Sequence, residues 1–435
     1  MKFLELIEKK KKAIPLNEDE YNFIIDGIIN NNIPDYQVTS FLMATYFNSM
    51  TNDELFLFTK SIISHSLIIK PIASNNLHIS VDKHSSGGVG DKVSLILSPI
   101  LSALGYDVIK LSGRGLSFTG GTIDKLESIG ITYEYNQDNF QKLIDQSHLV
   151  LMLQTNDIVP ADKILYNLRN ASATVDCLPL IASSIMSKKL VVETDYIFLD
   201  IKIGDGAFFK TIEEGEKFSK LAIDIANKFG RKLIIHLTSM SQPLGRTIGN
   251  AIEIKETIEF LQGTSKSSVL KTLIYNFVAD ILIDTNVCAS MASAQELIDN
   301  VINDGSAYQA WINFVSVFNG DSQAVQNNTY FDPKYKHEIY SEQAGYISIK
   351  STANIGLVAN LLGAGRFNKD DKIDNHAGIQ LFFDPNDYVE KNMLIATLYS
   401  SNPIENNVVQ QFVSNLEILD NKKEIQPIIL KKIAN

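Results

Sequence analysis

Short apolar segments typical of buried strands alternate with helical segments from residue 77 to residue 237, and this alternation constrains the fold most. Buried strands separated by helices are typical of a parallel sheet with crossover helices. The sequence therefore predicts a large mixed α/β domain. The strands expected in it are 77–81, 107–111, 149–153, 197–202 and 232–237.

Helical segments precede and interrupt this pattern. Residues 1–66 and 158–193 carry apolar residues at helical spacing without a strand pattern, so we expect a small helical domain across a cleft from the sheet. After residue 340 short strands and turns predict an α+β unit. The predicted domains are a helical domain (1–66 with 158–193), an α/β domain (67–157 with 194–335) and a C-terminal α+β domain (336–435).

The composition narrows the class of protein. With 435 residues, of which 45% are hydrophobic and 20% charged, the chain suits two or three globular domains. Its 39 basic and 50 acidic residues leave a net charge of −11, which argues against a nucleic-acid partner. No apolar run approaches the length of a membrane span, and the N-terminal apolar stretch is broken by acids, unlike a signal peptide. Because Cys177 and Cys288 form no disulfide framework, we predict a cytoplasmic protein with no membrane partner.

The first Gly-rich segment, residues 82–94, lies between an expected strand and an expected helix. Backbone N–H groups of such a turn, together with a helix N-terminus, bind anions, and Lys83, Ser85, Ser86 and Ser94 add a charge and hydroxyl groups. The spacing matches neither the P-loop nor the dinucleotide-binding motif. This segment alone is equally consistent with a tight turn that needs glycine for its geometry.

A second Gly-rich segment, residues 112–127, follows the next strand and contains Ser112 and Thr122. The carboxyl ends of parallel strands meet at one edge of a sheet, and ligands bind there. The two segments together predict an anion site at that edge.

Cationic and polar side chains also occur in the predicted helical segment 158–193. Tyr166, Arg169, Ser184 and Lys188 would face the Gly-rich segments across the cleft. On spacing alone, solvated charges on exposed helix faces explain Arg169 and Lys188 as well.

These segments resemble the thymidine phosphorylase and pyrimidine-nucleoside phosphorylase family. The resemblance implies a homodimer whose subunits catalyse a reversible reaction in pyrimidine salvage and catabolism. In it, a pyrimidine nucleoside and phosphate give the free base and 2-deoxyribose 1-phosphate or ribose 1-phosphate. The similar stretches are 83–94, 112–127, 166–189, 201–208, 242–245 and 369–374.

The resemblance also implies a role for each site residue. Those expected to hold phosphate are Lys83, Ser85, Ser86, Ser94, Ser112 and Thr122. Those expected to hold the pyrimidine are His84, Tyr166, Arg169, Val175, Ile181, Ser184, Lys188 and Phe208. For Val175, Ile181 and Phe208, core packing is the alternative.

Three of these residues suit the chemistry of the departing base. As the glycosidic bond breaks, negative charge develops on the pyrimidine, and Arg169 and Lys188 are donors that stabilise it. His84 can donate to a base carbonyl, or act as a general acid if it is protonated. We therefore predict His84, Arg169 and Lys188 as the catalytic residues; for His84 a purely structural hydrogen bond to the backbone is the alternative.

No cofactor and no metal is predicted, because inorganic phosphate is the co-substrate. Lys92 stands where some bacterial relatives have a threonine associated with a monovalent-cation site. The ammonium of Lys92, beside Glu256, could replace such an ion.

Two alternatives to this function remain open from the sequence. One is a phosphoribosyltransferase of the same architecture, such as anthranilate phosphoribosyltransferase, which has similar Gly-rich loops and uses magnesium. The other is a catalytically silent nucleoside-binding relative. The sequence also leaves open whether thymidine is preferred over deoxyuridine and uridine.

Overall fold

The computed structural model describes residues 1–72, 77, 79–115, 120–132, 137–153, 155, 157–366 and 371–435. Three segments singled out above lie partly outside these residues: 77–81 at residue 78, 112–127 at residues 116–119, and 369–374 at residues 369–370.

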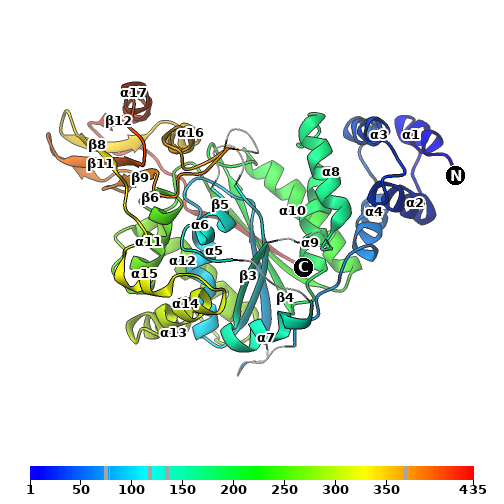
Figure 1. Cartoon of the computed structure of the whole chain (residues 1–435), viewed down its shortest axis with the longest axis horizontal. Coiled ribbons are helices and arrows are strands. Elements are labelled where there is room, and N and C mark those ends of the chain that lie inside the picture. The colour runs from blue at the N-terminus through cyan, green and yellow to red at the C-terminus, as the bar shows by residue number, and fades with distance from the viewer. Residues whose placement is uncertain are drawn as a thin grey trace.

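A six-stranded sheet forms the centre of the molecule, in the order β13-β5-β4-β1-β2-β3. The first five strands in the sequence pair in parallel, as predicted, and β13 pairs antiparallel to β5. Helices lie on both sides of this sheet (Figure 1). The strands are β1 (Ser80–Ser85), β2 (Asp107–Ser112), β3 (Leu149–Leu153), β4 (Tyr196–Ile203), β5 (Lys232–Ser239) and β13 (Ile429–Ala434).

Strand β1 begins and ends later than predicted, so Lys83, His84 and Ser85 belong to the strand itself. This strand lies between β2 and β4 and still carries charged residues. Lys83 and Asp82 are fully buried because each is paired, with Asp200 and Lys189 respectively. The apolar pattern used to predict strands therefore missed the second half of β1, because its residues are polar and are buried with polar partners.

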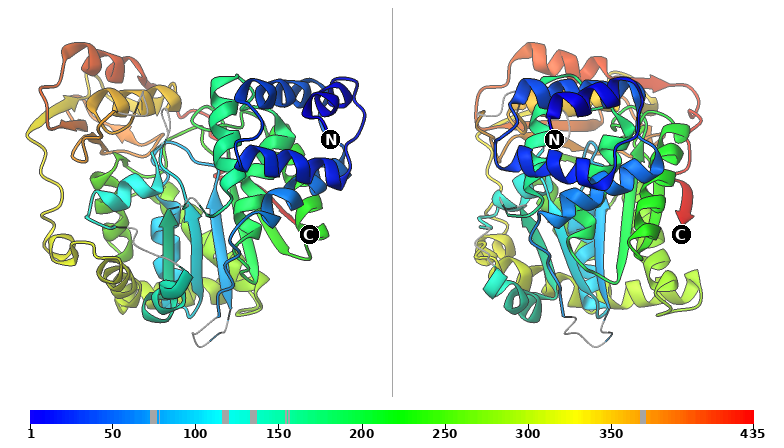
Figure 2. Two further views of the ribbon diagram at one scale, coloured as in Figure 1. Left: turned by 45° about the vertical axis from the view of Figure 1, so that its right-hand side comes forward. Right: turned by 90° about the vertical axis from the view of Figure 1, so that its right-hand side faces the viewer.

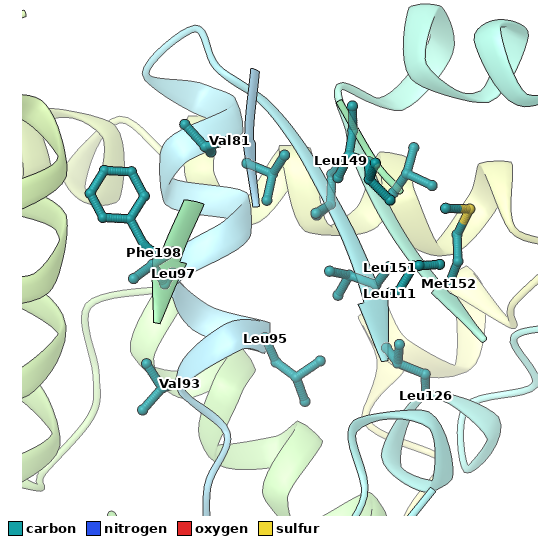
Figure 3. Close-up of a cluster of buried hydrophobic side chains, with 14 of the residues drawn as sticks. Val81, Val93, Leu95, Leu97, Leu111, Leu126, Leu149, Leu151, Met152 and Phe198 are labelled. Carbon is teal, nitrogen blue, oxygen red and sulfur yellow. The ribbon is translucent and has the colours of Figure 1, made fainter. Parts of the chain in front are cut away.

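Side chains alternate between the two faces of the central sheet. On β4, Ile197, Leu199 and Ile201 pack in the core formed with α9 (Leu178–Leu190) and α10 (Ile212–Lys228), whereas Phe198 belongs to the core on the other face. Figure 3 shows part of that second core, where apolar side chains of α5 (Val93–Ala103) lie beside those of the strands. This packing fixes α5, and with it the end of the first Gly-rich segment. The further helices of the α/β part are α6 (Thr122–Glu127), α7 (Gln137–Ser147), α11 (Ala251–Leu261), α12 (Ser268–Asp284), α13 (Met291–Asn303), α14 (Ser306–Val317) and α15 (Ser322–Asn327).

The structure contains a small helical domain, as the predicted fold class requires. Asn17 and Thr51 start two of its helices with capping boxes, each completed by the glutamate three residues on. Glu54 of the second box is buried and also accepts hydrogen bonds from Lys10 and Tyr21, which ties three helices together. The helices are α1 (Phe3–Lys11), α2 (Glu18–Ile29), α3 (Asp35–Asn48), α4 (Asn52–Ser64), α8 (Pro160–Ala171) and α9.

The C-terminal unit contains two small antiparallel sheets, in the orders β10-β8-β12 and β6-β9-β11-β7. It lies on the side of the central sheet opposite the N-terminal helices (Figures 1 and 2). Its elements are β7 (Tyr335–Tyr340), β8 (Gly345–Ile349), α16 (Thr352–Leu362), β9 (Gly378–Leu381), β10 (Tyr388–Val389), β11 (Leu394–Ser400), α17 (Asn406–Ser414) and β12 (Leu416–Leu419).

Two strands cross the predicted domain boundaries. Strand β13 lies within the predicted C-terminal domain but pairs with β5 of the central sheet. Strand β6 (Thr247–Gly249) lies within the predicted α/β domain but pairs with β9. Strand pairing is non-local, so the chain order of these segments could not reveal their partners.

No helix in the described part of the chain is long and apolar enough to cross a membrane.

Candidate active site

A cleft of about 790 Å³ lies between the carboxyl ends of β1 and β2 on one side and helices α8 and α9 on the other. All of the predicted site residues line it except Lys83. Those that line it are His84, Ser85, Ser86, Ser94, Ser112, Thr122, Tyr166, Arg169, Val175, Ile181, Ser184, Lys188 and Phe208. The Gly-rich segments and the helical cations therefore share one cavity.

Lys83 does not line the cleft, and the prediction that it holds phosphate needs correction. Its ammonium lies 3.1 Å from the Asp200 carboxylate and 3.4 Å from Ser94 Oγ, and its side chain is fully buried. Lys83 and His84 are neighbours on β1, so they point to opposite faces of the sheet, and His84 takes the cleft side. Lys83 therefore supports the site from behind, through Ser94.

Two adjacent lysines at the end of α9 also point in different directions, one into the cleft and one into the interior. Lys188 faces the cleft, and its ammonium contacts the Asp162 carboxylate and lies 3.1 Å from Ser184 Oγ. Lys189 is fully buried and donates to both carboxylate oxygens of Asp82, at 3.0 and 2.8 Å. The Lys189–Asp82 pair holds the helical domain against β1, directly beside His84.

The side of the cleft formed by the sheet contains hydroxyl groups and one unpredicted lysine. Ser112 Oγ is buried and has no hydrogen-bond partner among the described residues, so it is available to a ligand. Lys110 also lines the cleft, two residues before Ser112 on β2 and hence on the same face. Burial, and then the nearby charge of Lys189, lower the pKa of Lys110 to about 7. Strand alternation backward from Ser112 is the signal that would have identified Lys110.

Sequence reasoning also missed Asp91 and Arg114, which line the same side of the cleft. Asp91 accepts a hydrogen bond from the Ser85 hydroxyl, and Arg114 pairs with Glu127. Ser86 lines the cleft and accepts a hydrogen bond of 2.8 Å from the backbone N–H of Lys202.

On the helical side, Arg169 is held rigidly. Its guanidinium donates to the backbone carbonyls of Val175 at 2.6 Å and Leu180 at 3.2 Å, and only 3% of the residue is exposed. Burial lowers the pKa of this guanidinium, which still remains charged at any physiological pH. Arg169 therefore shapes the loop between α8 and α9 and presents a fixed charge to the cleft.

The apolar residues predicted to line the base pocket differ in burial. Phe208 is 43% exposed at the cleft, so core packing does not account for it. Ile181 is 8% exposed and both lines the cleft and packs in the core with α10. Phe209, which was not predicted as a site residue, lines the cleft beside Phe208.

His84 is neutral in the free protein. Desolvation in the cleft wall lowers its pKa well below the usual value, and the charges of Lys189, Lys110, Lys83 and Lys188 lower it further. Its Nδ1 is buried with no partner among the described residues. The imidazole can therefore donate one N–H as a neutral group, whereas the predicted alternative, an imidazolium acid, does not fit the free protein.

We expect the imidazole resonances of His84 not to titrate between about pH 6 and 8. Desolvation opposes protonation of the ring, and so do the nearby lysine charges, to which Lys110 adds only below about pH 7. Nuclear magnetic resonance of ¹⁵N-histidine-labelled protein, with His84→Gln to assign the signal, measures this. A midpoint near the usual histidine value would contradict the neutral assignment.

Lys92 occupies a cage of oxygen atoms beneath the first Gly-rich segment. Its ammonium donates to the carbonyls of Leu244 at 2.6 Å, Gly90 at 2.8 Å and Thr247 at 3.1 Å, and lies 3.0 Å from the Glu256 carboxylate. The side chain is fully buried. Carbonyl and carboxylate oxygens are ligands that suit a hard cation, but here the lysine ammonium already fills their centre. The residues present therefore do not fit an additional monovalent ion at this position.

Comparison with protein families first defines the class of protein to which the chain belongs. Residues 4–66 match the helical bundle domain of a glycosyl transferase family, and residues 77–308 match the a/b domain of that family. Residues 346–419 match the pyrimidine nucleoside phosphorylase C-terminal domain. All of the residues that line the cleft lie in the segment that matches the a/b domain.

Individual relatives narrow this class. The chain is 44% identical over 412 residues to a thymidine phosphorylase of Mycoplasmoides pirum, covering 94% of this chain and 98% of the relative. It is 37% identical over 435 residues to a pyrimidine-nucleoside phosphorylase of Staphylococcus aureus, covering 100% and 99%. The chain belongs to the thymidine phosphorylase and pyrimidine-nucleoside phosphorylase family, as its sequence motifs predict.

Solved structures show how widely the fold occurs. Anthranilate phosphoribosyltransferase from Thermus thermophilus aligns with a TM-score of 0.57 at 13% identity, covering 72% of this chain and 99% of that chain. The Saccharomyces cerevisiae enzyme aligns with the same score at 14% identity, covering 73% and 98%. At such identities the similarity establishes a shared fold only.

Proposed function

We propose that the protein catalyses the reversible phosphorolysis of pyrimidine nucleosides. Thymidine, and also deoxyuridine and uridine, would react with phosphate to give the free base and 2-deoxy-α-D-ribose 1-phosphate or ribose 1-phosphate. The observation that carries this proposal is the shared cleft, in which hydroxyl groups and Lys110 at the sheet edge face Arg169 and Lys188 on the helical domain. The family relationship agrees with it.

The geometry suggests how the two sides divide the reaction. A phosphate oxygen at the sheet edge forms the new bond to C1′ of the sugar, and the electron pair of the glycosidic bond leaves with N1 of the base. Arg169 and Lys188 stabilise the negative charge on the departing ring, and neutral His84 donates a hydrogen bond to a base carbonyl. The cleft also holds both reactants together, which lowers the entropic cost of their meeting.

A direct assay tests the function. Purified protein with thymidine and phosphate should release thymine in the presence of a metal chelator, and omission of phosphate should abolish the release. The phosphoribosyltransferase alternative predicts instead a product from anthranilate, phosphoribosyl diphosphate and magnesium, with no thymine. Calorimetric binding of thymine without turnover would indicate a silent relative. Comparing kcat/KM for thymidine, deoxyuridine and uridine establishes the preference, which we expect to favour thymidine.

We also propose that the protein is a cytoplasmic homodimer that associates through α1 and α3. These two helices contact each other and expose large apolar side chains, including Leu4 (61% exposed), Tyr36 (70%) and Phe47 (76%). Exposed apolar surface of this kind marks association sites.

The double variant Tyr36→Glu with Phe47→Glu is expected to elute as a monomer, because two buried charges at the contact would oppose association. Size-exclusion chromatography with light scattering measures the mass. The control is Tyr388→Glu, which changes a 54% exposed tyrosine in the C-terminal unit and should leave a dimer. A wild-type monomer, or a dimeric double variant, would contradict this surface.

The cage around Lys92 supports a further part of the proposed function, namely that activity needs no potassium. We expect wild-type kcat/KM and the melting temperature to be the same in potassium and tetramethylammonium chloride. Lys92→Met should lower the free energy of unfolding by about 3–5 kcal/mol, since it leaves buried oxygens without a partner. Lys255→Met, on the exposed side of α11, is the matched control. Potassium-dependent stability of the wild type would contradict this role.

A further inference from the structure

Asp91 places a negative charge in the part of the cleft where the proposed function needs an anion to bind. Its half-buried carboxylate lines the cleft together with Ser85, Ser94 and Ser112. One carboxylate oxygen accepts from the Ser85 hydroxyl and the other accepts from the backbone N–H of Val93 at 3.2 Å. An anionic ligand must either avoid this carboxylate or bring a proton to it.

Asp91 stays ionised. Burial acts to raise its pKa, but the ammonium groups of Lys202 and Lys83 and the hydrogen bond from Ser85 outweigh burial, so the pKa lies well below its usual value. Asp91 therefore acts only as a hydrogen-bond acceptor at neutral pH.

The hydrogen bonds of Ser85 follow from that charge. A serine hydroxyl has one proton, and here it is donated to Asp91. The backbone N–H of Gly87 donates to Ser85 Oγ at 3.2 Å and occupies part of its acceptor capacity. Ser85 cannot donate to a ligand at the same time, so Ser85 and Asp91 together present acceptors only.

Three other groups on this side of the cleft can donate to a ligand. Ser94 Oγ accepts from Lys83, which leaves its own proton for a ligand. Ser112 Oγ has no partner among the described residues, and Lys110 adds an amino group. The site thus has a donor side, which suits unprotonated oxygens, and an acceptor corner at Ser85 and Asp91, which suits an O–H.

We propose that Asp91, with Ser85, selects a protonated oxyanion, hydrogen phosphate, and rejects oxyanions of similar size that carry no proton. Hydrogen phosphate keeps one O–H at neutral pH and can donate it to this corner, whereas sulfate and monofluorophosphate have none. A site built to bond a ligand O–H rejects analogues that lack it, because acceptor groups are then left facing one another. This inference rests on the proposed function in taking phosphate as the ligand.

Calorimetric titration of the full-length wild-type protein with phosphate, sulfate and monofluorophosphate tests the proposal, at neutral pH, constant ionic strength and without nucleoside. Phosphate should bind about 100-fold more tightly than either of the other dianions. Monofluorophosphate separates the effect of the proton from that of charge, because it carries the same charge as hydrogen phosphate. Affinities within about threefold of one another, or no measurable phosphate binding, would overturn the proposal.

The variant Asp91→Asn replaces an acceptor oxygen by an N–H donor of the same shape. Sulfate should then bind at least about tenfold more tightly than to the wild type, and the phosphate preference should fall to under about tenfold. The matched control is Asp124→Asn, a buried carboxylate that holds the backbone N–H of Gly115 at 2.7 Å but does not line the cleft. It should change both affinities together and leave their ratio intact; an unchanged ratio in Asp91→Asn would overturn the proposal.

The titrations keep this proposal separate from the proposed function. Discrimination against sulfate in a protein that does not release thymine would support the Asp91 role and reject the phosphorolysis. Thymine release by a protein that binds sulfate as tightly as phosphate would support the phosphorolysis and reject the Asp91 role. If Asp91→Asn does not fold, the comparison of phosphate and monofluorophosphate binding to the wild type still tests the proposal.

Discussion

Arg169→Ala is expected to lower kcat/KM for thymidine by at least about 100-fold, the scale on which loss of one preorganised donor to a developing anion reduces turnover. Arg169 lines the cleft with its guanidinium held by the carbonyls of Val175 and Leu180. Because the guanidinium is already fixed, it needs no reorganisation as charge develops on the base. Steady-state kinetics with thymidine and saturating phosphate measure the loss.

A matched control separates this effect from simple loss of structure. Arg231 is a partly buried arginine that likewise donates to backbone carbonyls, those of Val192 and Thr194, but it does not line the cleft. Arg231→Ala should reduce thermal stability and leave kcat/KM within about threefold of the wild type. A loss of less than about tenfold for Arg169→Ala would remove Arg169 from the mechanism.

Lys110→Gln is expected to weaken phosphate binding by about 10- to 100-fold below pH 7, and by less at higher pH, because a charge-assisted hydrogen bond contributes about 1.5–3 kcal/mol. The pKa of Lys110 is about 7 in the free protein. Below that pH the amine is charged and attracts phosphate. Above it the free amine is neutral and must take up a proton when phosphate binds, so the wild-type advantage falls by up to about tenfold per pH unit.

The ratio of the variant and wild-type dissociation constants for phosphate, measured by calorimetry from pH 6 to 9, tests this. Taking the ratio cancels the ionisation of phosphate itself. Lys217→Gln, which changes an exposed lysine of α10, is the control and should give a ratio near one at every pH. A ratio for Lys110→Gln that does not change with pH would contradict the lowered pKa.

The sequence predicted the family, the fold class and most of the cleft because these depend on local patterns. The apolar strands β3, β4 and β5 are short-range features, and they are confirmed. The capping boxes at Asn17 and Thr51 likewise depend only on residues three apart in the sequence. The Gly-rich segments follow parallel strands, so their meeting at one sheet edge followed from topology.

The differences arise where orientation or distant pairing matters. Lys83 and His84 are adjacent, as are Lys188 and Lys189, and in each pair one residue faces the cleft and the other forms a buried ion pair. The register of β1 in the sheet and the rotation of α9 against the sheet decide which residue of each pair faces the cleft and which forms the buried ion pair. Lys110 and Asp91 were missed for the same reason, since a lysine in a strand and an aspartate in a turn carry no signal until their neighbours are known.

The sequence by itself determined which chemical groups the protein can bring to a pyrimidine nucleoside and phosphate, because motif composition and strand order are properties of the chain. Only the tertiary structure decided which of those groups are donors, acceptors or neutral. Hydrogen-bond direction and pKa depend on burial and on charges from distant segments, such as Lys202 near Asp91 and Lys189 near both His84 and Lys110.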